Sequence, residues 1–125
     1  MSNEQSSRFI AIVDDDRSVQ TALQDLIESE GLSTLCFGSA EQFLDSGAQH
    51  KAACLIADIR MPGMSGLELQ TKLKAERCRI PIIFVTAHGD AKMCTQAMRD
   101  GAVKFLAKPF DDRVLLEAVH AALEN

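Results

Sequence analysis

The sequence predicts an α/β protein: a doubly wound, parallel sheet of five strands with helices on both faces. Five short apolar segments, several of them rich in branched side chains, predict the strands. The segments between them carry apolar residues three and four positions apart, which predicts amphipathic helices. Strands that alternate with helices form a parallel sheet, because each right-handed crossover packs its helix on one face.

The alternation begins with an apolar strand at residues 9–13, which three consecutive aspartates follow. From Arg17 onward the period becomes that of a helix, which Gly31 ends. Its apolar face consists of Val19, Leu23, Leu26 and Ile27. Residues 33–37 then form a second, shorter strand.

A capping-box pattern, Ser39 with Gln42 three positions later, opens the second helix, and Gly47 ends it. Its buried side is expected to consist of Ala40, Phe43 and Leu44. The third strand, at residues 53–57, is a run of small and apolar residues typical of a strand buried on both faces. It delivers one carboxylate, Asp58, just before Pro62 and Gly63 turn the chain.

Ser65 can cap the third helix, whose inward positions are Leu67, Leu69 and Leu73. The fourth strand, residues 82–86, ends in the hydroxyl of Thr86. Asp90 is the expected N-cap of the fourth helix, which extends to Gly101. The side chains expected on its core face are Met93, Ala97 and Met98.

The last strand, residues 103–107, ends at Lys108-Pro109, and Asp111 or Asp112 caps the last helix. The core face of that helix consists of Leu115, Ala118, Val119 and Ala122. The chain of 125 residues shows no internal repeat or linker. We therefore expect one domain over residues 1–125, with residues 1–8 as a polar N-terminal tail and no output domain.

Composition excludes several classes of function. The formal net charge is −5, whereas proteins that bind nucleic acid directly draw affinity from clustered Lys and Arg. No apolar run approaches the roughly 20 residues of a membrane span, and the polar N-terminus is not a signal peptide. These observations predict a cytoplasmic protein that contacts neither membrane nor, through these residues, DNA.

Polar side chains follow four of the strands, at the point where each strand ends. They are Asp14 and Asp15, Asp58, Thr86 and Lys108. Because the carboxyl ends of parallel strands meet at one edge of a sheet, these side chains should gather there. Grouped carboxylates repel one another unless positive charge is supplied, here by Lys108 and a divalent cation. Carboxylate oxygens suit Mg²⁺ and not zinc or copper.

These segments together resemble the receiver domain of a two-component response regulator. The motifs that carry the resemblance are Val13-Asp14-Asp15-Asp16, Asp58-Ile59-Arg60-Met61-Pro62-Gly63-Met64-Ser65-Gly66, Thr86-Ala87 and Lys108-Pro109-Phe110. The resemblance covers essentially the whole chain. The residues around Asp58 are most similar to the FixJ-like branch. The resemblance to the receiver domain implies a flavodoxin-like sheet with strand order 2-1-3-4-5.

The resemblance also implies a role for each residue of the cluster. Asp58 would be the phosphoacceptor, taking a phosphoryl group from a sensor histidine kinase, with Thr86 and Lys108 assisting by position and charge. Asp15, Asp58 and the backbone carbonyl of Arg60 would bind Mg²⁺, with Asp14 helping directly or through water. The domain would assist its own phosphorylation without being a turnover enzyme. Lys108-Pro109 would be a cis peptide.

The resemblance further implies a conformational switch. Thr86 would move toward the phosphoryl group, and Phe105 would turn inward into the space that it leaves. The surface of the fourth helix, last strand and last helix would then change, to control a homodimer or a separate DNA-binding output domain in transcription regulation. His88 is expected to tune the phosphate lifetime or access to the site.

Three alternatives stay open. Asp14-x-Asp16 superficially fits a haloacid-dehalogenase-type phosphatase with Asp14 as nucleophile, although the chain is short and Asp58 would then have no role. A flavin-binding module would need aromatic side chains around the flavin, and the chain has no Trp or Tyr. Within the receiver interpretation, the domain could be a stand-alone phosphorelay component without an output domain.

Overall fold

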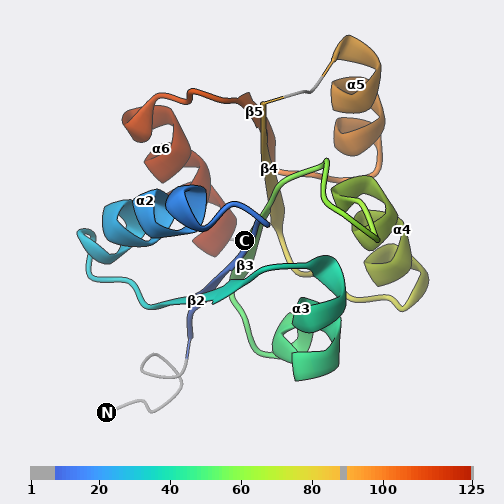
Figure 1. Ribbon diagram of the computed structural model, residues 1–125, viewed down its shortest axis with the longest axis horizontal. Helices are drawn as coiled ribbons and strands as arrows, with labels where there is room; N and C mark the ends of the chain where they lie inside the picture. The colour runs from blue at the N-terminus through green and yellow to red at the C-terminus, as the bar shows by residue number, and fades with distance from the viewer. Residues whose placement is uncertain (1–7, 88–89, 125) are drawn as a thin grey trace.

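A computed structural model of the chain describes residues 8–87 and 90–124 and confirms the predicted fold (Figure 1). Five parallel strands form one sheet in the order β2-β1-β3-β4-β5. The strands are β1 (Ile10–Val13), β2 (Thr34–Phe37), β3 (Cys54–Ala57), β4 (Ile82–Thr86) and β5 (Lys104–Ala107). The expected polar tail, residues 1–8, lies outside the described residues apart from Arg8.

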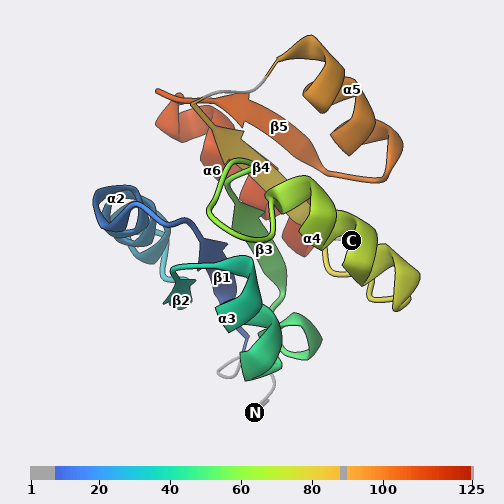
Figure 2. The same ribbon diagram turned by 45° about the vertical axis from the view of Figure 1, so that its right-hand side comes forward.

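Helices cover both faces of the sheet, as Figures 1 and 2 show. They are α2 (Arg17–Glu28), α3 (Ala40–Ser46), α4 (Gly66–Ala75), α5 (Ala91–Arg99) and α6 (Asp112–Leu123), with a short 3₁₀ helix η1 (Ala48–His50) after α3. Helices α2 and α6 pack on one face, and α3, α4 and α5 pack on the other. The fourth helix, last strand and last helix, whose surface is expected to change in the conformational switch, correspond to α5, β5 and α6. No helix within the described residues is long and apolar enough to cross a membrane.

Alternation along the strands divides the core into two layers. In β1, Ile10 and Ile12 face α2 and α6, while Ala11 and Val13 face α3. All four residues of β1 and of β3 are buried, as expected for central strands that are covered on both faces. The two layers therefore cover both faces of the sheet with buried apolar side chains.

The register of the sheet brings the ends of the strands level. Val13 pairs with Phe37 on one side and with Ala57 on the other. The ladder continues one residue further, since Asp14 N donates to Phe37 O at 3.1 Å and Asp58 N donates to Val13 O at 3.0 Å. The residues that follow β1 and β3 therefore leave the sheet side by side at its carboxyl edge.

The helix caps agree with the sequence in most places. Asp16, Ser39, Ser65, Asp90 and Asp111 each accept a backbone hydrogen bond at the start of a helix, so Asp111 and not Asp112 caps α6. The expectation for Met98 was wrong: its side chain is 42% exposed, whereas Ala97 is fully buried. Helix α5 presents only a narrow face to the sheet, which includes Ala97. Met98, the next residue along the helix, lies outside that face and is exposed to solvent.

Candidate functional site

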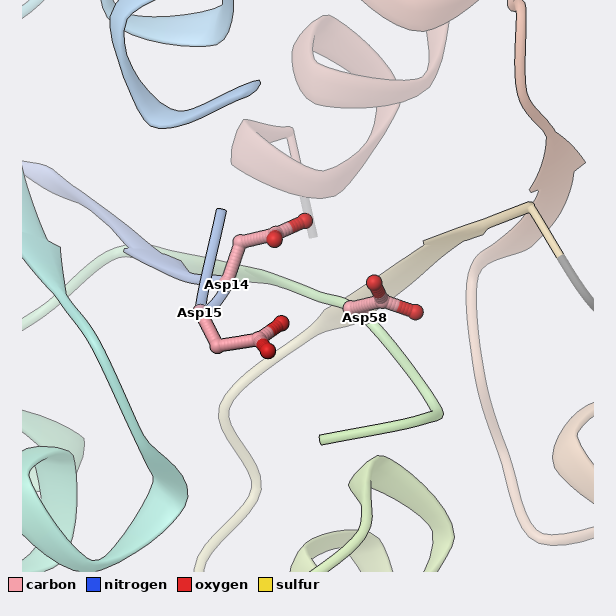
Figure 3. Close-up of side chains that lie close together, drawn as sticks. All are labelled: Asp14, Asp15 and Asp58. Atoms are coloured by element: carbon pink, nitrogen blue, oxygen red, sulfur yellow. The ribbon is translucent and has the colours of Figure 1, made fainter. Parts of the chain in front are cut away.

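Three carboxylates meet at the carboxyl edge of the sheet (Figure 3). Asp14 and Asp15 follow β1 and Asp58 follows β3, and one ligand oxygen from each lies within 4.8 Å of the others. Asp14 and Asp58 are buried, whereas Asp15 is exposed. The cluster thus has an inner side set in the protein and an outer side open to an incoming molecule.

Lys108 brings positive charge into this cluster from the loop after β5. Its Nζ donates to Asp14 Oδ2 at 2.9 Å and to Asp58 Oδ2 at 3.1 Å. Its backbone N–H also donates to Thr86 O, and the peptide bond to Pro109 is cis, as the resemblance implies. One ammonium group therefore bridges two carboxylates that come from different strands.

Burial and hydrogen bonding shift the pKa of Asp14 in opposite directions, and they do the same to the pKa of Lys108. Burial raises the pKa of Asp14 above its usual value, against hydrogen bonds from the Asp16 backbone and from Lys108. Burial also lowers the pKa of Lys108, but the hydrogen bonds and charges of Asp14 and Asp58 outweigh it, and the net pKa is raised. Lys108 therefore remains an ammonium group at neutral pH, and the carboxylates keep a counter-charge.

The remaining predicted residues that the structure describes are Arg60 after β3, Thr86 at the end of β4 and Phe105 in β5. Thr86 is buried at the end of β4, and the backbone N–H of Arg60 donates to Asp58 Oδ1 at 3.2 Å. Phe105 of β5 is half-buried, and its ring centroid lies 6.5 Å from that of Phe84 on the neighbouring strand. His88 lies outside the described residues. The structure thus gathers Asp14, Asp15, Asp58 and Lys108 directly, with Thr86 at the same edge of the sheet.

The cluster fits a Mg²⁺ ion by its chemistry. All three of its side chains offer carboxylate oxygens, the hard ligands that Mg²⁺ takes from proteins. Asp15 is exposed, so an ion held there could keep positions open to other oxygen ligands. The donor set therefore agrees with the predicted cofactor.

Three contacts around the site were not predicted from the sequence. Gln20 of α2 donates through Nε2 to Asp14 O at 2.6 Å, and Glu41 of α3 accepts from Met64 N at 2.9 Å. At Gly66, an added Cβ would overlap the carbonyl oxygen of Asp58. Gln20 and Glu41 stand on the polar sides of their helices, where no local pattern distinguishes them. Gly66 did carry a signal, because it is the last residue of the motif after Asp58 that carries the resemblance.

A doubly wound sheet with carboxylates and a lysine at its carboxyl edge defines a class of protein that handles phosphoryl groups or cations there. Comparison with known proteins narrows the class. The family model of the response regulator receiver domain matches residues 10–120. The chain therefore belongs to the response regulator receiver domain family, as part of two-component signalling.

Relatives with sequence similarity over most of this chain are bacterial regulators. Nodulation protein W of Bradyrhizobium diazoefficiens is 48% identical, over 94% of this chain and 52% of its own length. Transcriptional regulatory protein FixJ of Azorhizobium caulinodans is 43% identical, over 91% of this chain and 54% of its own length. The chain thus spans about half the length of these relatives.

A solved structure gives the same fold. The crystal structure titled FixJ-N superposes with a TM-score of 0.84 at 38% identity and covers 100% of this chain and 97% of its own. The similarity to the FixJ-like branch, stated above from the residues around Asp58, is confirmed by both sequence and structure.

Asp14→Asn should raise the free energy of unfolding in magnesium-free buffer at pH 7. A carboxyl group whose pKa is raised by folding binds more protons in the native state than in the unfolded state. The wild type therefore loses stability as the pH rises from below 3.8 through the raised pKa of Asp14, and the variant lacks this loss. Urea unfolding at pH 4 and pH 7 measures both effects.

The control for this prediction is Asp45→Asn. Asp45 is an exposed aspartate of α3 whose side chain makes no hydrogen bond or ion pair among the described residues. It should leave the unfolding curve nearly unchanged at both pH values. If Asp14→Asn were less stable than the wild type at pH 7, the bond to Lys108 would outweigh the burial of the carboxylate.

Proposed function

We propose that Asp58 is the phosphoacceptor of this receiver domain and that a sensor histidine kinase is the donor. The observation that carries the proposal is the position of the Asp58 carboxylate, 3.1 Å from Lys108 Nζ and within the cluster of Asp14 and Asp15. An Asp58 oxygen would attack the phosphorus atom, and the phosphorus–nitrogen bond of the donor phosphohistidine would break. The products are an acyl phosphate on Asp58 and a free histidine.

The residues around Asp58 can support this transfer by position and charge. Phosphoryl transfer passes through a loose transition state whose charge lies on the equatorial oxygens. The ammonium group of Lys108 already contacts Asp58, so it can stay close to those oxygens, and the Thr86 hydroxyl can donate to them from the neighbouring strand. Ala87, after Thr86, is small and leaves room for the incoming group.

Asp15, Asp58 and the backbone carbonyl of Arg60 would hold Mg²⁺, with Asp14 contributing directly or through water. Bound there, Mg²⁺ would neutralise the carboxylates and offer open positions to phosphoryl oxygens. The hydrogen bond from Arg60 N to Asp58 Oδ1 supports this arrangement, because it keeps the backbone of Arg60 next to the carboxylate.

Phosphorylation would switch the surface formed by α5, β5 and α6. An acyl phosphate carries nearly two negative charges where the carboxylate carried one, which attracts Thr86 and Lys108. Phe105 would follow Thr86 inward. Its half-buried ring beside Phe84 supports this, since only a part of the ring remains to be covered. The altered surface would control a homodimer.

The domain is proposed to regulate transcription through a DNA-binding output domain. The name of the FixJ relative and its greater length support this, while a stand-alone phosphorelay receiver remains the second candidate. Residues 1–125 would act as a single receiver domain in the cytoplasm. The phosphatase alternative is not proposed, because Asp58, which it left without a role, lies in the cluster.

Incubation with acetyl phosphate tests the proposed function. With Mg²⁺ present, intact mass should increase by one phosphoryl group, and EDTA should prevent the increase. Borohydride reduction followed by peptide mass analysis should place the group on Asp58. A phosphoryl group on Asp14, or a gain of mass that does not depend on Mg²⁺, would overturn the proposal.

A further inference from the structure

Glu41 joins two parts of the chain that the phosphoacceptor site does not itself connect. Glu41 lies in the first turn of α3, and its Oε2 accepts a hydrogen bond from the backbone N–H of Met64 at 2.9 Å. Met64 belongs to the loop between Asp58 and α4. Figure 2 shows the start of α3 beside this loop. The bond thus links a helix to the segment that supplies Asp58 and Arg60.

The loop is shaped to receive this carboxylate. Gly63 has a φ of +80°, and a Cβ added to it would lie 2.6 Å from Glu41 Oε2. A side chain at this position would therefore be strained in its backbone and would press on the carboxylate. The loop and Glu41 fit together closely because residue 63 is glycine.

Three more hydrogen bonds of the loop join residues close in sequence. Arg60 N donates to Asp58 at 3.2 Å, Ser65 N donates to Glu68 Oε1 at 2.8 Å, and Gly66 N donates to Ile59 O at 2.8 Å. These three bonds shape the loop and join it to the start of α4. The bond between Met64 and Glu41 joins the loop to α3, after the turn made by Pro62 and Gly63.

Glu41 is itself held in place by the start of α3. Ser39 Oγ accepts from Gln42 N at 3.1 Å, and Gln42 Oε1 accepts from Gly38 N at 3.0 Å. Phe37, one residue earlier, accepts from Asp14 N at 3.1 Å. A short series of contacts therefore leads from the aspartates after β1, through the start of α3, to the loop after β3.

We propose that Glu41 is a positioning residue for the cation site, acting through its hydrogen bond to Met64. The bond holds the loop so that the Arg60 carbonyl keeps its place relative to Asp15 and Asp58. A loop that is ordered before binding loses less entropy when the cation binds, which raises affinity. The inference rests on the proposed function, since it assumes that Mg²⁺ binds at these residues.

Mg²⁺ titration of four proteins by calorimetry tests this role: wild type, Glu41→Ala, Glu41→Gln and Asp45→Ala. Glu41→Ala should raise the Mg²⁺ dissociation constant roughly tenfold, the lower range for loss of a residue that supports a metal ligand. Glu41→Gln keeps an acceptor for Met64 and should stay within about twofold of wild type. Asp45→Ala, on the same helix, should bind as the wild type does.

Two further measurements separate positioning from a general loss of structure. The amide proton of Met64 should exchange faster with solvent in Glu41→Ala but not in Glu41→Gln. Phosphorylation by acetyl phosphate should slow in Glu41→Ala at low Mg²⁺ and recover at saturating Mg²⁺. Thermal unfolding should show all four proteins folded, because the side chains of Glu41 and Asp45 are exposed.

Two results of the Mg²⁺ titrations would overturn the positioning role of Glu41. Equal Mg²⁺ affinity in Glu41→Ala and Asp45→Ala would overturn it. A loss in Glu41→Gln as large as in Glu41→Ala would also overturn it, because charge and not the bond would then be responsible. A wild type that binds no Mg²⁺ would instead contradict the proposed function, and the inference would fail with it, before any variant is compared.

Discussion

Asp58→Asn should take up no phosphoryl group from acetyl phosphate at any Mg²⁺ concentration. The amide lacks the anionic oxygen that attacks phosphorus in the proposed reaction, so the acyl phosphate should not form. The variant should still fold, because an asparagine can occupy the same volume and its carbonyl oxygen can accept the hydrogen bond from Arg60 N. Intact mass after incubation measures uptake directly, and urea unfolding confirms the fold.

The matched control for this result is Asp14→Asn, which removes a carboxylate from the same cluster and leaves the proposed nucleophile, Asp58, in place. It should still gain one phosphoryl group, at a higher Mg²⁺ concentration than the wild type requires. If Asp58→Asn gained the group on Asp14 at the wild-type extent, the phosphatase-type chemistry would be correct and the receiver assignment of Asp58 would not.

Gly66→Ala should lower the free energy of unfolding by about 3 kcal/mol, at the upper end for overpacking. The added methyl group would overlap the Asp58 carbonyl oxygen and lie 3.0 Å from Ile59 Cα. These are backbone atoms next to a fully buried strand, so they cannot move aside as a flexible side chain could. An ordinary glycine-to-alanine change in a helix would stabilise it by about 1 kcal/mol, so the expected sign is reversed here.

Gly38→Ala is the control for Gly66→Ala. A methyl group at Gly38 would meet only the end of the Gln42 side chain, at 3.4 Å, so its effect should be within about 0.5 kcal/mol. Urea unfolding compares the two variants. In the folded fraction of Gly66→Ala, displacement of Asp58 should also slow phosphorylation. Wild-type stability in Gly66→Ala would show that α4 can move away from β3.

The parts of the fold that could be predicted were those with a strong local pattern. Continuous apolar runs marked β1, β3 and β4, and the bounds of the strands agree with the sequence within one residue. The order of the strands does not follow from such patterns and came from the resemblance. At the site, one observation sufficed to place Asp14, Asp58 and Lys108 together: each follows an apolar strand of a parallel sheet.

The residues that could not be predicted act through contacts between distant segments. Glu41 and Met64 are 23 positions apart, and neither interrupts the pattern of its own element. Gln20 likewise reaches the carbonyl of Asp14 from the side of a helix. Met98 was assigned to the core because apolar character alone does not show how narrow the buried face of α5 is. Such contacts depend on the packing of whole elements.

The contacts of Lys108 with Asp14 and Asp58 also affect how the chain folds before it is phosphorylated. Its ammonium group already balances two carboxylates in the interior, so the chain carries its own counter-ion. A newly synthesised chain should therefore reach its native structure without waiting for a metal, and a chelator should leave that structure intact. The supply of Mg²⁺ would then determine when the domain can be phosphorylated, and the domain would stay folded when Mg²⁺ is scarce.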